Sequence, residues 1–107
     1  MLYPRKGRKE TSSIFVFIAP GQILPFHCHP FPTFAYMKSG SIEVEKMDGS
    51  KKKFIKGDII SEVANSWHRG KNLSSLKKVE IIVFYIGQKS IQNTIIHSKE
   101  NHNKCRI

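Results

Sequence analysis

The stretch PFHCHPFPTFAYMKSG, residues 25–40, decides how the rest of the sequence is interpreted. Two histidines, His27 and His29, stand one residue apart, and on a β-strand residues i and i+2 point to the same face. Their imidazoles therefore project together, while Cys28 between them points away. Two imidazoles on the inward face of a strand predict shared coordination of a metal ion. The alternative is a metal-free pocket lined by neutral imidazoles.

Short apolar segments recur on both sides of this stretch. They are rich in Ile, Val and Phe or alternate in polarity, as strands do, and turn dipeptides such as Pro20-Gly21 and Asp48-Gly49 separate them. The expected strands cover residues 12–19, 33–38, 41–47, 51–56, 59–64 and 79–87. No segment before residue 88 has a helical period. The pattern predicts an all-β sandwich or barrel whose interior takes Ile42, Val44 and alternate residues of the last strand.

The length of 107 residues suits one compact domain. We expect a basic N-terminal segment, a β-barrel domain and a polar tail, at residues 1–11, 12–87 and 88–107. The tail has one apolar patch, at Ile91, Ile95 and Ile96, which predicts a short strand or a helical turn.

The charge of the chain is strongly basic, with 18 Lys and Arg against 8 Asp and Glu and a formal net charge of +10. Such a balance can attract nucleic acid or anionic molecules. The basic residues are scattered, however, and no recognition-helix pattern or aromatic RNA-binding motif accompanies them. We therefore expect a solvated basic surface and no nucleic-acid partner.

The two cysteines, Cys28 and Cys105, lie far apart in the sequence. With only two, reduced thiols are expected rather than a disulfide scaffold, and Cys28 is expected to be an inert packing residue. No apolar run approaches the roughly 20 residues of a membrane span, and the first residues lack the apolar core of a secretory signal. The expectation is a cytoplasmic protein without a membrane partner, with export left open if the true start lies upstream.

The histidine pair belongs to a longer pattern that resembles the cupin superfamily, whose members are small jelly-roll barrels, or double-stranded β-helices, with two motifs. The first motif reads Gly21, five residues, His27-Cys28-His29, three residues, Thr33, six residues and Gly40. The second motif reads Gly57, five residues, Val63, one residue, Asn65, two residues, His68, three residues and Asn72. The family carries a glutamate where Thr33 stands, and a proline and a glycine where Val63 and Asn65 stand.

The resemblance implies that His27, His29 and His68 ligate one divalent transition metal (Fe, Zn, Ni, Mn or Cu) inside the barrel. Thr33 does not carry over as a ligand, because a neutral hydroxyl is a poor substitute for a carboxylate. Three-histidine sites nevertheless occur in enzymes, where they leave positions open for water or substrate. Without the glutamate the charge of the metal is uncompensated by protein ligands, which favours a small anionic ligand or substrate.

Two classes of function stay open, and no catalytic residue is assigned. The first is a metal-dependent enzyme, dioxygenase-like or isomerase-like, that acts on a small anionic molecule. The second is a non-catalytic cupin that binds or senses a small ligand or a metal.

Several other residues carry simpler expectations. Segments 14–19 and 81–86 are apolar on both faces, which predicts a homodimer. Glu62 could face the pocket, but the surface or an interface is the expectation for a glutamate. The aromatic residues Tyr36 and Trp67 could line the pocket or the core, and the core is expected. The histidines and the cysteine of the tail are weak metal-site candidates, namely His97, His102 and Cys105.

Overall fold

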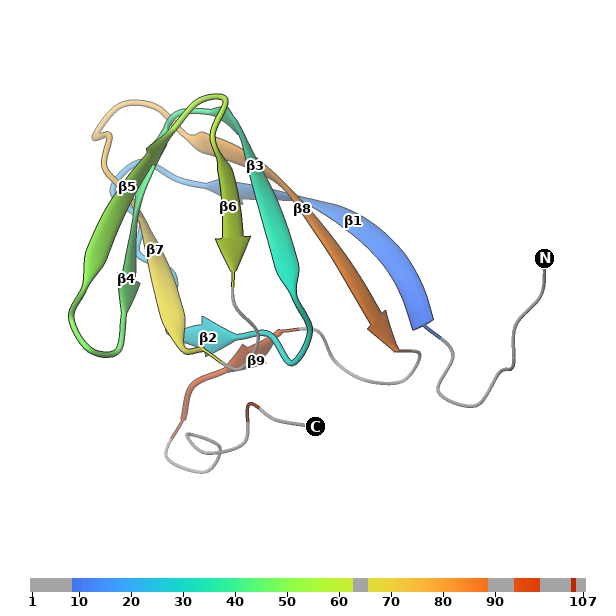
Figure 1. The fold of residues 1–107 in the computed structure, drawn as a ribbon. Helices are drawn as coiled ribbons and strands as arrows, with labels where there is room; N and C mark the ends of the chain where they lie inside the picture. Colours follow the sequence, from blue (N-terminus) through green and yellow to red (C-terminus); the bar gives the residue numbers. More distant parts are fainter. Residues whose placement is uncertain (1–8, 63–65, 89–93, 99–104, 106–107) are drawn as a thin grey trace.

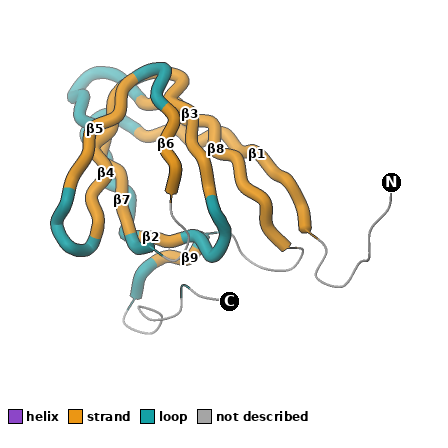
Figure 2. Tube along the Cα trace, viewed as in Figure 1, coloured by secondary structure: helices purple, strands orange, loops and turns teal. Residues whose placement is uncertain are grey.

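The computed structural model describes residues 9–62, 66–88, 94–98 and 105 (Figure 1). In these residues the chain forms β-strands joined by loops and turns and has no helix (Figure 2), so no described helix could span a membrane. The strands are β1 (Lys9–Ile18), β2 (His27–Cys28), β3 (Thr33–Ser39), β4 (Ser41–Lys46), β5 (Lys51–Ile55), β6 (Ile59–Glu62), β7 (His68–Asn72), β8 (Val79–Gln88) and β9 (Ile95–Ile96). Residues 1–8 and most of the polar tail lie outside the described residues, so the division into three parts stays a prediction.

Two antiparallel sheets build the barrel. The four-stranded sheet has the order β1-β8-β3-β6 and the five-stranded sheet the order β5-β4-β7-β2-β9. Figure 1 shows them on opposite sides of the molecule, with the first long strand beside the late strand β8. The structure confirms the predicted all-β jelly-roll fold. In the apolar patch of the tail, Ile95 and Ile96 form the short strand β9, while Ile91 lies outside the described residues.

Glycine residues form two of the turns at which strands of the barrel end. The predicted hairpin at Asp48-Gly49 joins β4 to β5; Gly49 has a φ of +89°, and its N–H donates to the Lys46 carbonyl at 2.9 Å. Gly40, between β3 and β4, has a φ of +85°, and a Cβ there would lie 2.8 Å from Cγ2 of Val79. Both conformation and space therefore require glycine at this position.

The core lies between the sheets, where alternate residues of each strand point inward. Its buried members are Ile18, Ala35, Met37, Ile42, Ile60, Val79 and Ile81. The predicted interior positions are confirmed, since Ile42 is buried and Val44 packs against this cluster. The expectation for Tyr36 is wrong, because the alternation that buries Ala35 and Met37 turns Tyr36 outward.

The outer face of the four-stranded sheet is apolar. One cross-strand row runs through Phe15 of β1, Ile82 of β8, Tyr36 of β3 and Ile59 of β6. The exposed fractions are 60% for Phe15 and 69% for Ile59. A second row pairs Phe84 of β8 with Phe34 of β3, both also exposed.

Candidate metal centre

Three histidines meet at one end of the five-stranded sheet. His27 of β2 is the cross-strand partner of His68 of β7, and His29 directly follows β2. One nitrogen from each ring lies within 4.8 Å of one from each of the other two. The ring centroids of His27 and His68 are 4.4 Å apart, and that of His29 lies 5.2 Å from each. The structure thus brings together the three residues that the sequence singled out.

Backbone carbonyls fix the orientation of two of these rings. Nδ1 of His27 lies 2.9 Å from the Pro25 carbonyl, and Nδ1 of His68 lies 2.9 Å from the Ser66 carbonyl. A carbonyl oxygen only accepts, so each Nδ1 donates, and the neutral ring keeps its lone pair on Nε2. This arrangement resembles the outer hydrogen bond that holds metal-binding histidines.

The Nε2 atom of His68 supports the fit to a metal ion. It is buried and has no hydrogen-bond partner among the described residues. An oxygen of Glu62 lies 3.3 Å away but does not meet hydrogen-bond geometry. A buried polar atom without a partner is costly, and a transition-metal ion would satisfy this lone pair together with those of the neighbouring imidazoles.

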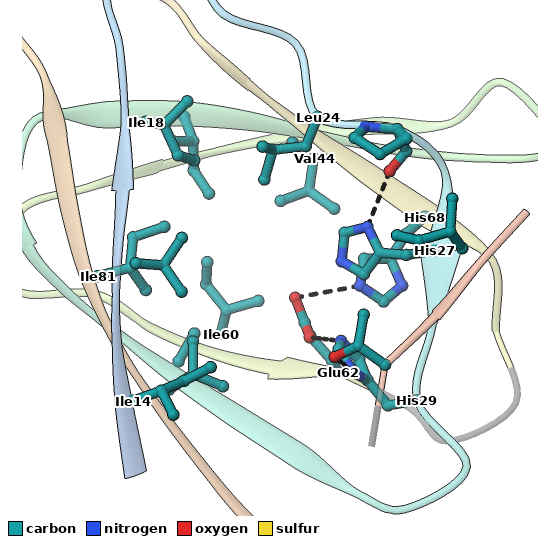
Figure 3. A pocket seen from close by; sticks show the side chains of 18 residues that line it. Ile14, Ile18, Leu24, His27, His29, Val44, Ile60, Glu62, His68 and Ile81 are labelled. Atoms are coloured by element: carbon teal, nitrogen blue, oxygen red, sulfur yellow. Dashed lines mark hydrogen bonds and ion pairs between the residues drawn. The ribbon is translucent and has the colours of Figure 1, made fainter. Parts of the chain in front are cut away.

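Glu62 lies beside the histidines and is the site residue that the sequence interpretation assigned to the surface. Its Oε2 is 2.8 Å from Nε2 of His29, and its Oε1 is the oxygen 3.3 Å from Nε2 of His68 (Figure 3). Its side chain is only 16% exposed. The expectation of a surface glutamate is wrong, because β6 directs both Ile60 and Glu62 inward. The two-residue spacing from apolar Ile60 was the available signal.

The charges of the cluster depend on one another. Burial, joined by the neighbouring histidine charges, lowers the pKa of His27 below 6.5. Burial also opposes the charged form of His68, but the interaction with Glu62 outweighs it and raises the pKa of His68. For Glu62, burial opposes ionisation, yet the contacts with His29 and His68 lower the pKa to about 2. At neutral pH the cluster therefore offers a carboxylate and at least one neutral imidazole.

Thr33 takes no direct part in this cluster. It is fully buried, and its hydroxyl donates to the Phe31 carbonyl at 3.1 Å. Its side chain is therefore satisfied by backbone, as expected for a residue that is not a ligand.

The histidines and Glu62 close one end of a cavity of about 310 Å³. Figure 3 shows the remaining wall, which is aliphatic: Ile14, Ile18, Leu24, Val44, Ile60 and Ile81. Thr94 adds a hydroxyl 3.4 Å from Nδ1 of His29. The cavity is small, apolar and polar at one end only, as ligand sites commonly are.

A disulfide lies behind the histidine strand. Cys28, between His27 and His29, points away from the cavity as predicted, but it bonds to Cys105 with a Cα–Cα distance of 6.1 Å. The expectation of two reduced thiols is therefore wrong, and both cysteines are buried. The tail does not form a second metal site in the described residues, because His97 packs edge-on against Trp67 and His102 lies outside them.

The fold and the histidine cluster together define a class of protein. It is a barrel of two antiparallel sheets that encloses a small cavity, with a candidate metal site at one end. A family model described as a cupin domain matches residues 14–85, and the chain belongs to this family. No curated protein matched the chain.

Solved structures share the fold at low sequence identity. The DMSP lyase DddQ from Ruegeria pomeroyi has a TM-score of 0.69 and 16% identity over 80% of this chain, which spans only 42% of that protein. Oxalate decarboxylase from Bacillus subtilis has a TM-score of 0.68 and 21% identity over 82% of this chain, which spans 24% of that protein. An uncharacterised protein with a double-stranded β-helix domain from Klebsiella pneumoniae has a TM-score of 0.66 and 18% identity over 92% of this chain, which spans 91% of that protein.

Proposed function

We propose that this cupin holds one divalent transition metal through His27, His29 and His68 and uses it on a small anionic molecule bound in the cavity. The convergence of three imidazole nitrogens within 4.8 Å carries the proposal. Neutral imidazoles suit iron, zinc, nickel or copper, whereas calcium and magnesium prefer oxygen ligands. When bound, the metal would supply Lewis-acid or oxygen-activating chemistry.

The protein's own residues would bind and orient the small molecule. The aliphatic wall excludes water from one side of the cavity, and the polar end holds the charged group. A divalent ion beside the Glu62 carboxylate leaves a net charge of +1 at that end, so an anionic ligand remains favoured. Two of the proteins that share this fold are a DMSP lyase and an oxalate decarboxylase, and both names describe enzymes that act on small molecules.

A second candidate function is non-catalytic binding or sensing of a metal or small ligand. One observation favours it: apart from the three histidines and Glu62, no described residue that lines the cavity is titratable. Proton transfer during a reaction would therefore have to use the cluster itself.

Metal analysis tests the proposed site. Protein purified without nickel columns or added metal is expected to contain, or after chelation to take up, about one equivalent of transition metal per chain. Elemental analysis and titration with Zn²⁺ and Co²⁺ measure this. Small carboxylates should then change the visible spectrum of the Co²⁺ form. A protein that binds neither ion contradicts the proposal.

A homodimer is the assembly that we propose, built by the outer face of the four-stranded sheet. Phe15, Phe34, Phe84 and Ile59 are exposed there on neighbouring strands. Contiguous apolar surface of this kind marks an interaction site, and a two-fold contact would place the same face of a second copy against it.

A further inference from the structure

The carboxylate that the cupin motif lacks at position 33 has a counterpart on the neighbouring strand. Thr33 of β3 and Glu62 of β6 are direct cross-strand partners. Paired residues of an antiparallel sheet project from the same face, with Cβ atoms about 4.5–5.5 Å apart. A carboxylate at position 62 therefore enters the barrel next to the place where one at position 33 would enter it.

The Glu62 side chain places one carboxylate oxygen beside Nε2 of His29 and the other beside Nε2 of His68. Oε2 lies 2.8 Å from Nε2 of His29, and Oε1 lies 3.3 Å from Nε2 of His68 (Figure 3). The carboxylate thus reaches across from the four-stranded sheet to the three imidazoles of the five-stranded sheet.

The hydrogen bonds on the far side of the rings indicate what belongs between these atoms. Because Nδ1 of His68 donates to the Ser66 carbonyl, the neutral ring presents a lone pair to Oε1 of Glu62. Two acceptors at 3.3 Å repel each other unless a proton or a metal ion lies between them. Since this buried Nε2 makes no hydrogen bond to any described residue, the geometry fits a metal ion better than a proton.

We propose that Glu62 is the carboxylate ligand of the centre and replaces, from the adjacent strand, the glutamate that would occupy position 33. The inference rests on the proposed metal site of His27, His29 and His68. It makes the ligand set three nitrogens and one oxygen, drawn from both sheets. It also removes one of the open positions that a three-histidine site would leave for water or substrate.

Moving the carboxylate back tests this assignment. Glu62→Gln keeps the shape of the side chain but removes its charge, and we expect its affinity for Zn²⁺ to fall by about 100-fold or more, the upper end of what losing an outer partner of a ligand costs. The double variant Glu62→Gln with Thr33→Glu should regain at least about tenfold, because the carboxylate returns to the family position. Glu80→Gln, a half-buried glutamate of β8 outside the site, is the matched control and should bind as the wild type does.

Spectroscopy separates a ligand from a residue that only positions the histidines. The visible bands of the Co²⁺ form should shift in Glu62→Gln and return towards the wild-type spectrum in the double variant. The infrared difference between metal-free and Zn²⁺-loaded wild type should show a carboxylate band that moves on binding, a measurement that needs no variant to fold. An unmoved band, or an unchanged Co²⁺ spectrum in Glu62→Gln, overturns the assignment.

The outcomes for the two proposals are distinguishable. If the wild type binds neither Zn²⁺ nor Co²⁺, the proposed metal site itself fails. If the wild type binds Zn²⁺ and Glu62→Gln binds it equally well, the three-histidine site stands and only the role of Glu62 is wrong.

Discussion

The two sheets of the barrel differ on both of their faces. The five-stranded sheet supplies three histidines to the interior and carries charged residues outside, among them the Arg69–Glu45 ion pair at 2.7 Å. The four-stranded sheet supplies one carboxylate and several aliphatic side chains to the interior, and its outer face is aromatic. The chemistry at the centre is therefore made between the sheets, whereas the surface for assembly belongs to one of them.

Removing one histidine should have the largest effect on this division of roles. We expect His68→Ala to reduce the bound metal well below one equivalent, because it removes one of the three proposed imidazole ligands. Elemental analysis measures the loss, and circular dichroism should show that the barrel persists. His97→Ala is the control, because His97 lies outside the cluster, and this variant should bind as much metal as the wild type. Full metal in His68→Ala would contradict the three-histidine site.

A charge on the outer face of the four-stranded sheet should change assembly but not metal content. We expect Phe15→Glu to convert a dimer to a monomer, since a carboxylate would be buried within the apolar row at the contact. Light scattering distinguishes twice the chain mass of 12.3 kDa from the chain mass itself. Ile55→Glu, at an exposed apolar residue of β5 in the other sheet, should leave the dimer intact. A wild-type monomer at micromolar concentration would refute the interface.

The pH dependence of stability should differ between the metal-free and the metal-loaded protein. Glu62, whose pKa falls from 4.5 to about 2, stabilises the metal-free fold above pH 4.5, and this contribution is lost as the pH falls towards 2. His68, whose pKa is raised above 6.5, contributes below pH 6.5, and its contribution is lost as the pH rises through the raised value. The ion pair thus stabilises most between pH 4.5 and 6.5.

Thermal unfolding of wild type and Glu62→Gln checks this window. The advantage of the metal-free wild type should be greater at pH 5.5 than at pH 8.5, by a few degrees, since about 1 kcal/mol shifts the melting temperature of such a domain by roughly 4–8 °C. With Zn²⁺ present, the advantage of the wild type over Glu62→Gln should instead be greater at pH 8.5 than at pH 5.5, because protons compete with the metal for the imidazoles. An equal difference between the two proteins at both pH values would count against the ion pair.

The smallest effect is expected at Thr33. Thr33→Ala should leave metal content unchanged and lower the free energy of unfolding by about 1 kcal/mol, the cost of leaving the part-buried Phe31 carbonyl without its donor. Elemental analysis and chemical denaturation measure the two quantities. Metal loss in this variant would show that the hydroxyl is part of the centre.

The difference between the sheets also explains what the sequence could predict. His27, His29 and His68 were found because their spacing is local to each motif and the motifs fix the fold. Glu62 was assigned to the surface, the usual place of a carboxylate; its direction depends on which residues of β6 point inward, for which the spacing from Ile60 was the local signal. The side that Tyr36 faces likewise depends on which residues of β3 point inward. The disulfide left no local signal, since its cysteines are 77 positions apart.

That disulfide gives the molecule a covalent topology that the strands alone do not have. Everything from Cys28 to Cys105 is one closed ring, so a chain cut at the Asp48-Gly49 turn would remain a single molecule. The chain-entropy estimate for a ring of this size is roughly 4–5 kcal/mol of stabilisation. Since such bonds persist only in oxidising surroundings, the redox potential around the protein enters directly into how firmly the strand that carries His27 is held.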